Sequence, residues 1–89
     1  MTMKVIVLYR PNSEYARRVE DFAKELERQY QARIDLLSLD TRDGASTASL
    51  YDVMQNPAIL VLANDGQLVK DWQGGNMPLM NEISYYTHI

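Results

Sequence analysis

Hydrophobic residues in this chain form short unbroken runs and a longer helical repeat. Runs at positions 4–9, 34–39 and 58–63 are rich in Val, Ile and Leu, and polar or turn-forming residues bound them. Runs of this length and composition are typical of strands buried within a sheet. The pattern therefore predicts three core strands.

Between the first two runs, apolar residues recur every three or four positions, with charged residues between them. This spacing predicts the strongest amphipathic helix of the chain. Its apolar face is Tyr15, Val19, Phe22, Leu26 and Tyr30, with Ala23 beside it. Asn12 or Ser13 is the predicted N-cap, because both side chains can accept a hydrogen bond from a helix amide.

The second half of the chain has weaker helical signals and one strong turn. A turn is predicted at 40–44 and a helix at 47–55, with Leu50, Val53 and Met54 on its apolar side. The tripeptide at 64–66, Asn-Asp-Gly, predicts a hairpin into a strand at 68–73. Pro78 is expected in the first turn of a final helix that carries Leu79, Met80, Ile83 and Tyr86 inward.

The predicted order is β-α-β-α-β-β-α in one domain spanning residues 1–89. Strands joined through helices are expected to be parallel, and the tight turn at 64–66 requires the last pair to be antiparallel. The prediction is therefore an α/β fold with a four-stranded mixed sheet flanked by three helices.

The composition of the chain excludes several classes of ligand and chemistry. The formal net charge of −3 argues against nucleic acid, which requires clustered Lys and Arg. The chain has no cysteine, and its one histidine is His88, so neither disulfides nor a thiolate or histidine metal site is expected. No apolar stretch is long enough to cross a membrane, no cofactor is expected, and cytoplasmic residence is the default expectation.

The first strand and helix start resemble a glutaredoxin active-site segment. Where that family has Cys-Pro-Tyr-Cys, this chain has Ser13, Glu14, Tyr15 and Ala16. Thiol–disulfide exchange requires an attacking thiolate, so no dithiol oxidoreductase activity is expected. Ser13 is interpreted as a helix cap, since no neighbouring histidine in the sequence could act as its base.

The second half resembles the cis-proline region of thioredoxin-like domains. The stretch at 51–58, Tyr-Asp-Val-Met-Gln-Asn-Pro-Ala, is similar to that region, and Gly74 follows the hairpin as in the family. The resemblance implies a thioredoxin fold with a cis bond between Asn56 and Pro57. Each motif is short, and it is their order and spacing that identify the fold.

The resemblance implies, as the leading hypothesis, a redox-inactive module that binds an unidentified protein or peptide beside Pro57. In the family, backbone groups next to this proline pair with an extended peptide. The implied groove residues are Pro11, Asn12, Ser13, Tyr15, Ala16, Asn56, Pro57 and Ala58. Trp72 is a second candidate contact, with packing against the final helix as the equal alternative.

A second hypothesis is a glutathione site, as in glutaredoxins and glutathione transferases. The resemblance implies contacts from Tyr9, Ser13, Gly74, Gly75 and Asn76. A third hypothesis is a protein of the KaiB type. It is ranked last because the predicted hairpin favours the ordinary thioredoxin arrangement. The sequence identifies neither a partner nor an oligomeric state.

Overall fold

The computed structural model describes residues 3–30, 34–74, 78 and 80–87. Its elements follow the predicted order. The strands are β1 (Lys4–Tyr9), β2 (Ile34–Ser38), β3 (Ala58–Leu62) and β4 (Leu68–Gln73), and the helices are α1 (Ala16–Tyr30), α2 (Arg42–Leu50) and α3 (Met80–Thr87). The α/β class and the four-stranded mixed sheet are therefore confirmed.

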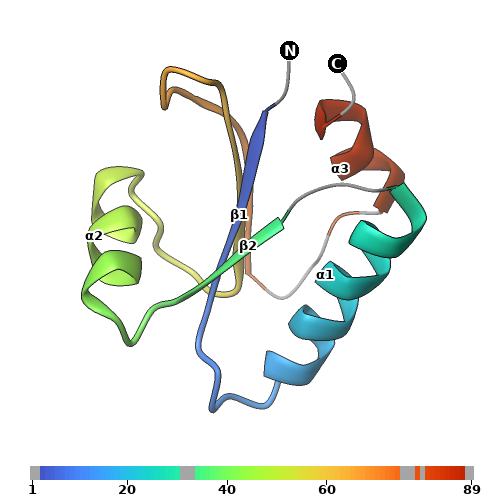
Figure 1. Cartoon of the computed structure of the whole chain (residues 1–89). Helices are drawn as coiled ribbons and strands as arrows, with labels where there is room; N and C mark the ends of the chain where they lie inside the picture. Colours follow the sequence, from blue (N-terminus) through green and yellow to red (C-terminus); the bar gives the residue numbers. More distant parts are fainter. Residues whose placement is uncertain (1–2, 31–33, 75–77, 79, 88–89) are drawn as a thin grey trace.

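The sheet has the strand order β2-β1-β3-β4. β1 and β2 are parallel, whereas β3 is antiparallel to β1 and β4 is antiparallel to β3. The expectation that helix-separated strands are all parallel was therefore wrong for β3. Asp52 takes a positive φ of 55° after α2 ends. The following segment runs back along the sheet, so β3 starts where β1 finishes (Figure 1).

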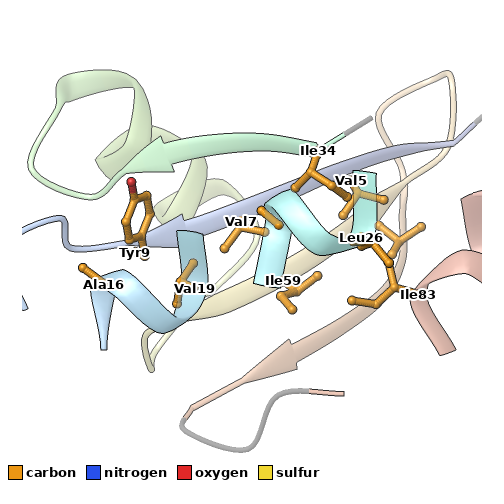
Figure 2. Close-up of a cluster of buried hydrophobic side chains, with 11 residues drawn as sticks. Val5, Val7, Tyr9, Ala16, Val19, Leu26, Ile34, Ile59 and Ile83 are labelled. Atoms are coloured by element: carbon orange, nitrogen blue, oxygen red, sulfur yellow. The ribbon is translucent and has the colours of Figure 1, made fainter. Parts of the chain in front are cut away.

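Two hydrophobic layers hold the sheet between helices. α1 and α3 lie over one face and α2 over the other (Figure 1). Alternate residues of β1 and β3 enter the two layers, as their period of two requires. Val5, Val7 and Ile59 meet Leu26 of α1 and Ile83 of α3 (Figure 2). The second layer, under α2, is built from Ile6, Leu8, Ala58, Leu60 and Leu62.

The three helices pack against the sheet to different extents. α1 and α2 are the two helices that pack against strand β2, one on each face. α3 has only eight residues and packs beside α1, with Ile83 fully buried in their shared layer. On α1, Val19, Ala23 and Leu26 are buried as the helical repeat predicts.

The second helix begins earlier than predicted. A helix was expected at 47–55, but α2 starts at Arg42 and ends at Leu50. The signal is Thr41, whose hydroxyl oxygen accepts from the Gly44 amide at 3.0 Å and so caps the helix. The shift leaves Leu50 and Met54 exposed, at 73% and 86%, although both were predicted to face inward.

Candidate functional site

The loops that the sequence singled out meet at one end of the sheet. β1 and β2 both finish there, and antiparallel β3 starts there, with Ala58 opposite Leu8. β4 also ends there, with Gln73 opposite Ala58. This topology brings together two walls: the first is residues 10–16, which follow β1, and the second is residues 53–57, which precede β3.

Hydrogen bonds fold the first wall back on itself. The Ser13 amide and hydroxyl both donate to the Arg10 carbonyl, at 3.1 and 2.6 Å. Ser13 thus closes a turn, and α1 begins three residues later at Ala16. The prediction that Ser13 caps the helix is not confirmed. Its hydroxyl donates to the preceding Arg10 carbonyl and accepts no hydrogen bond from an amide of α1.

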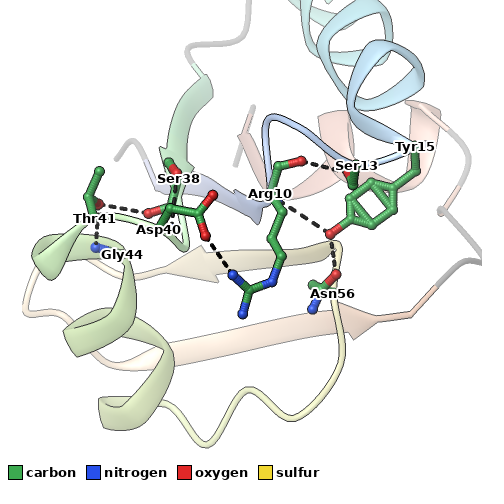
Figure 3. Close-up of polar contacts among 8 residues, drawn as sticks. All are labelled: Arg10, Ser13, Tyr15, Ser38, Asp40, Thr41, Gly44 and Asn56. Atoms are coloured by element: carbon green, nitrogen blue, oxygen red, sulfur yellow. Dashed lines mark hydrogen bonds and ion pairs between the residues drawn. The ribbon is translucent and has the colours of Figure 1, made fainter.

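The Tyr15 phenol joins the two walls (Figure 3). Its oxygen accepts from the Arg10 amide at 3.3 Å, and its hydroxyl donates to the Asn56 side-chain oxygen. On the other side, the Arg10 guanidinium pairs with the Asp40 carboxylate at 2.6 Å. Both charged groups are about half exposed, so the pair contributes little stability and serves mainly to define the rim.

Gln73 at the end of β4 orders the second wall. Its side-chain oxygen accepts from the amides of Met54 and Gln55, at 2.8 and 3.1 Å. The Gly74 amide donates to the Pro57 carbonyl at 3.0 Å, and the bond between Asn56 and Pro57 is cis. Within the described ranges, no hydrogen bond uses the main-chain N–H or carbonyl of Asn56. Asn56 is an exposed residue, so these two main-chain groups are candidates for pairing with a ligand.

A cavity of about 270 Å³ opens beside Asn56. Apolar side chains from the end of β2, from α2 and from the second wall share its lining with polar groups. The lining residues are Arg10, Leu39, Ala45, Ala48, Val53, Met54, Gln55 and Asn56. A recess that combines apolar side chains with polar groups is a candidate ligand subsite.

The structure divides the predicted groove residues into accessible and inaccessible sets. Pro11, Asn12 and Asn56 are exposed, and Ser13 and Tyr15 are partly so. The side chains of Ala16, Pro57 and Ala58 are buried, and Ala58 is wholly inside the layer under α2. These three residues shape the walls without offering side-chain contacts.

The hydroxyls proposed for a glutathione site are engaged elsewhere. Tyr9 is buried in the layer under α1, and its hydroxyl donates to Glu20 at 2.9 Å. Burial raises the pKa of the Tyr9 phenol above 10.0, and the hydrogen bond and negative charge of Glu20 raise it further. Tyr9 is therefore a poor source of a proton or of a phenolate. Of the other implied contacts, Gly75 and Asn76 lie outside the described residues.

Sequence reasoning missed the residues that line the cavity and its rim. Arg10 and Asp40 carry opposite charges directly after parallel neighbouring strands, a placement that predicts their meeting at one sheet end. Leu39 and Val53 looked like ordinary core positions. Within the described ranges, no cluster of three or more His, Asp or Glu side chains could hold a metal ion. None of the described helices is long and apolar enough to span a bilayer.

Trp72 packs against the final helix, which was one of the two alternatives predicted for it. It is partly buried against the layer under α1, and its ring meets that of Tyr86 edge-on at 5.9 Å. Trp72 also lines a surface cavity together with Tyr85. Trp72 therefore packs against α3 and also reaches the surface.

Comparisons with solved structures identify the fold. A mutant thioredoxin from Halobacterium salinarum superposes with a TM-score of 0.76 at 20% identity, covering 99% of this chain and 77% of its own. An uncharacterised thioredoxin-like protein from Clostridium perfringens gives 0.74 at 15% identity, covering 94% and 67%. Oxidised thioredoxin from Plasmodium falciparum gives 0.70 at 15%, covering 97% and 83%. No protein-family model and no curated sequence matches the chain. The chain thus has a thioredoxin-like fold and no cysteine.

Proposed function

We propose that this chain is a thioredoxin-like binding module without thiol chemistry, which holds an extended peptide against Asn56. A chain without cysteine cannot form the mixed disulfide on which dithiol exchange depends. The two walls nevertheless remain side by side, joined through Tyr15. What such a site can still do is bind.

The observation that carries the proposal is the unpaired main chain of Asn56, an exposed residue. Its N–H and carbonyl form no hydrogen bond within the described part of the chain. An extended peptide that pairs with it would gain main-chain hydrogen bonds, as in strand addition. The neighbouring amides of Met54 and Gln55 are hydrogen-bonded to Gln73. These bonds hold the segment in place, and with it the unpaired main chain of Asn56.

The cavity beside Asn56 supplies the second part of the recognition. Leu39, Ala48 and Val53 contribute apolar lining, and Met54 also lines the cavity with 86% of its surface exposed. Burying a methionine side chain contributes about 1.5–3 kcal/mol. We therefore propose that the bound peptide places one apolar side chain in this cavity, next to the residue that pairs with Asn56.

Peptide selection from a random phage-displayed library, followed by calorimetry with synthetic peptides, tests the proposal. Met54→Ser should weaken binding of a selected peptide at least about tenfold, given the apolar area lost. Leu50→Ser is the matched control, because Leu50 is similarly exposed but does not line the cavity. N-methylation of the peptide at the residue facing Asn56 should abolish binding.

Three results would refute the proposal. They are a selection that yields no binder to the folded chain, equal losses from the two variants, and tolerance of the methylated backbone. Ala58→Asp is unsuitable as a test because Ala58 is fully buried, and a carboxylate there would disrupt the core.

A further inference from the structure

The outer edge of β4 offers a second surface, distinct from the Asn56 site although Gln73 at the end of the same strand borders that site. β4 is the last strand of the sheet, and no strand pairs with its outer side in the described part of the chain. Lys70 and Trp72 lie opposite Val61 and Ile59, which belong to the layer under α1 and α3. Asp71 lies between them on the other face, where its carboxylate accepts a hydrogen bond from the Gln73 side chain at 2.8 Å. The edge therefore presents a cation and an aromatic ring on one face and an anion on the other.

An aromatic cavity of about 340 Å³ lies beside this edge. It is lined by Lys70, Trp72, Glu82, Tyr85 and Tyr86. The Tyr85 and Tyr86 rings meet edge-on at 5.2 Å, and Tyr85 remains 65% exposed. The Lys70 ammonium lies 5.8 Å from the centre of the Trp72 ring, within the range of a cation–π contact. An exposed aromatic group beside an open strand edge is a typical feature of binding surfaces.

We propose that the β4 edge receives an extended segment of another protein as a fifth, antiparallel strand. Directly opposed side chains in such a pair lie on the same face, and opposite charges stabilise it. The segment is therefore expected to place an aromatic residue opposite Trp72, a basic residue opposite Asp71 and an acidic residue opposite Lys70. Because it runs antiparallel to β4, it reads aromatic–basic–acidic along its own chain, with the aromatic ring entering the cavity.

Charge distinguishes this partner from a second copy of the same chain. In a two-fold symmetric antiparallel pair, a residue near the strand centre lies opposite its own copy. For the six residues of β4, the two central registers place Lys70 opposite Lys70 or Asp71 opposite Asp71. Like charges directly opposed are destabilising, and charged residues on an edge discourage self-pairing. The edge is thus suited to a segment of complementary charge.

Intrinsic fluorescence tests this directly, because Trp72 is the chain's one tryptophan. The probe is a blocked hexapeptide, Thr-Tyr-Lys-Glu-Val-Thr, whose second residue faces Trp72 and whose fourth faces Lys70. Saturable change in the Trp72 emission is expected within the millimolar range. Lys70→Glu should weaken binding about fivefold or more, and exchanging the peptide's Lys and Glu for Glu and Lys should reduce binding to the unmodified chain.

The controls separate this surface from the Asn56 site. Met54→Ser should leave the hexapeptide titration unchanged, and a peptide that binds at Asn56 should bind the Lys70→Glu variant normally. Unchanged Trp72 emission on folded protein would overturn the proposal. So would equal binding of the peptide in which Lys and Glu are exchanged. Emission that depends on protein concentration, together with a dimeric mass in sedimentation, would assign the edge to a second copy and would also overturn it.

Discussion

Gly44→Ala is expected to destabilise the fold, although intrinsic helix propensity predicts the reverse. Gly44 lies in the first turn of α2 and is buried against the end of β2. A Cβ atom at this position would lie 1.8 Å from the Ser38 carbonyl oxygen and 2.6 Å from its carbon. Both atoms belong to the backbone, so rotation of a side chain cannot relieve the contact.

The two effects can be compared in magnitude. Replacing Gly with Ala inside a helix contributes about 0.8–1.0 kcal/mol of propensity. Overpacking a well-packed interior costs about 1–3 kcal/mol. A contact of 1.8 Å with main-chain atoms belongs at the upper end of that cost. The net expected loss is therefore about 2 kcal/mol, or about 8–16 °C in the melting temperature of a domain this size.

Urea unfolding followed by circular dichroism measures this change, with the transition fitted as two-state. Ser46→Ala, on the exposed side of the same helix, is the control, and it should leave stability equal or slightly raised. A Gly44→Ala variant as stable as the unmodified chain would refute the reasoning, because it would mean that α2 does not approach β2 this closely. The cavity wall that α2 contributes would then be misplaced as well.

Two further predictions concern single side chains. Thr41→Ala should cost about 1 kcal/mol in urea unfolding by removing the cap on the Gly44 amide, and Thr41→Ser should restore most of it; equal stability of all three would contradict the cap. Of the six tyrosines, Tyr9 should ionise late in an ultraviolet titration because its pKa is raised, and Glu20→Gln should bring that pKa down. Because the folded-state pKa lies above the unfolded value of 10.0, the Tyr9 contribution to stability is present below pH 10 and lost as pH rises further; unchanged stability above pH 10 in a Tyr9→Phe comparison would argue against it.

Most of the fold could be predicted from patterns among neighbouring residues. The one error in the predicted topology, the direction of β3, concerns an arrangement set by residues far apart in the sequence. The runs at β1 and β3, the repeat on α1 and the turn at 64–66 each depend on neighbouring residues, and each is found where expected. The direction of β3 depends on where the segment after α2 travels, and no local pattern reports that. Gly44 misled the placement of α2, since a glycine resembles a turn residue when its role is close approach to a strand.

The candidate site was predictable by position and less so by contact. Resemblance located the two walls, and the structure brings Tyr15 to Asn56 across 41 residues of sequence. The resemblance could not show which side chains are accessible, because in the sequence Ala58 and Met54 both look like interior residues of a strand or helix. Burial decides between them: Ala58 is enclosed, and Met54 is 86% exposed. The Arg10–Asp40 pair depends on the register of β1 and β2. The sequence predicted that these strands are parallel but not which residues lie opposite each other.

The distribution of engaged and free polar groups favours binding over catalysis at this site. A reactive hydroxyl needs a base to take its proton. Here the Ser13 hydroxyl donates to the Arg10 carbonyl, the Tyr15 hydroxyl to Asn56 and the Tyr9 hydroxyl to Glu20. Each hydroxyl is thus held in a structural bond. The groups left free are the Asn56 main chain and the apolar edge at Met54. Groups of this kind suit a peptide backbone and one apolar side chain, which is why we propose binding at this site.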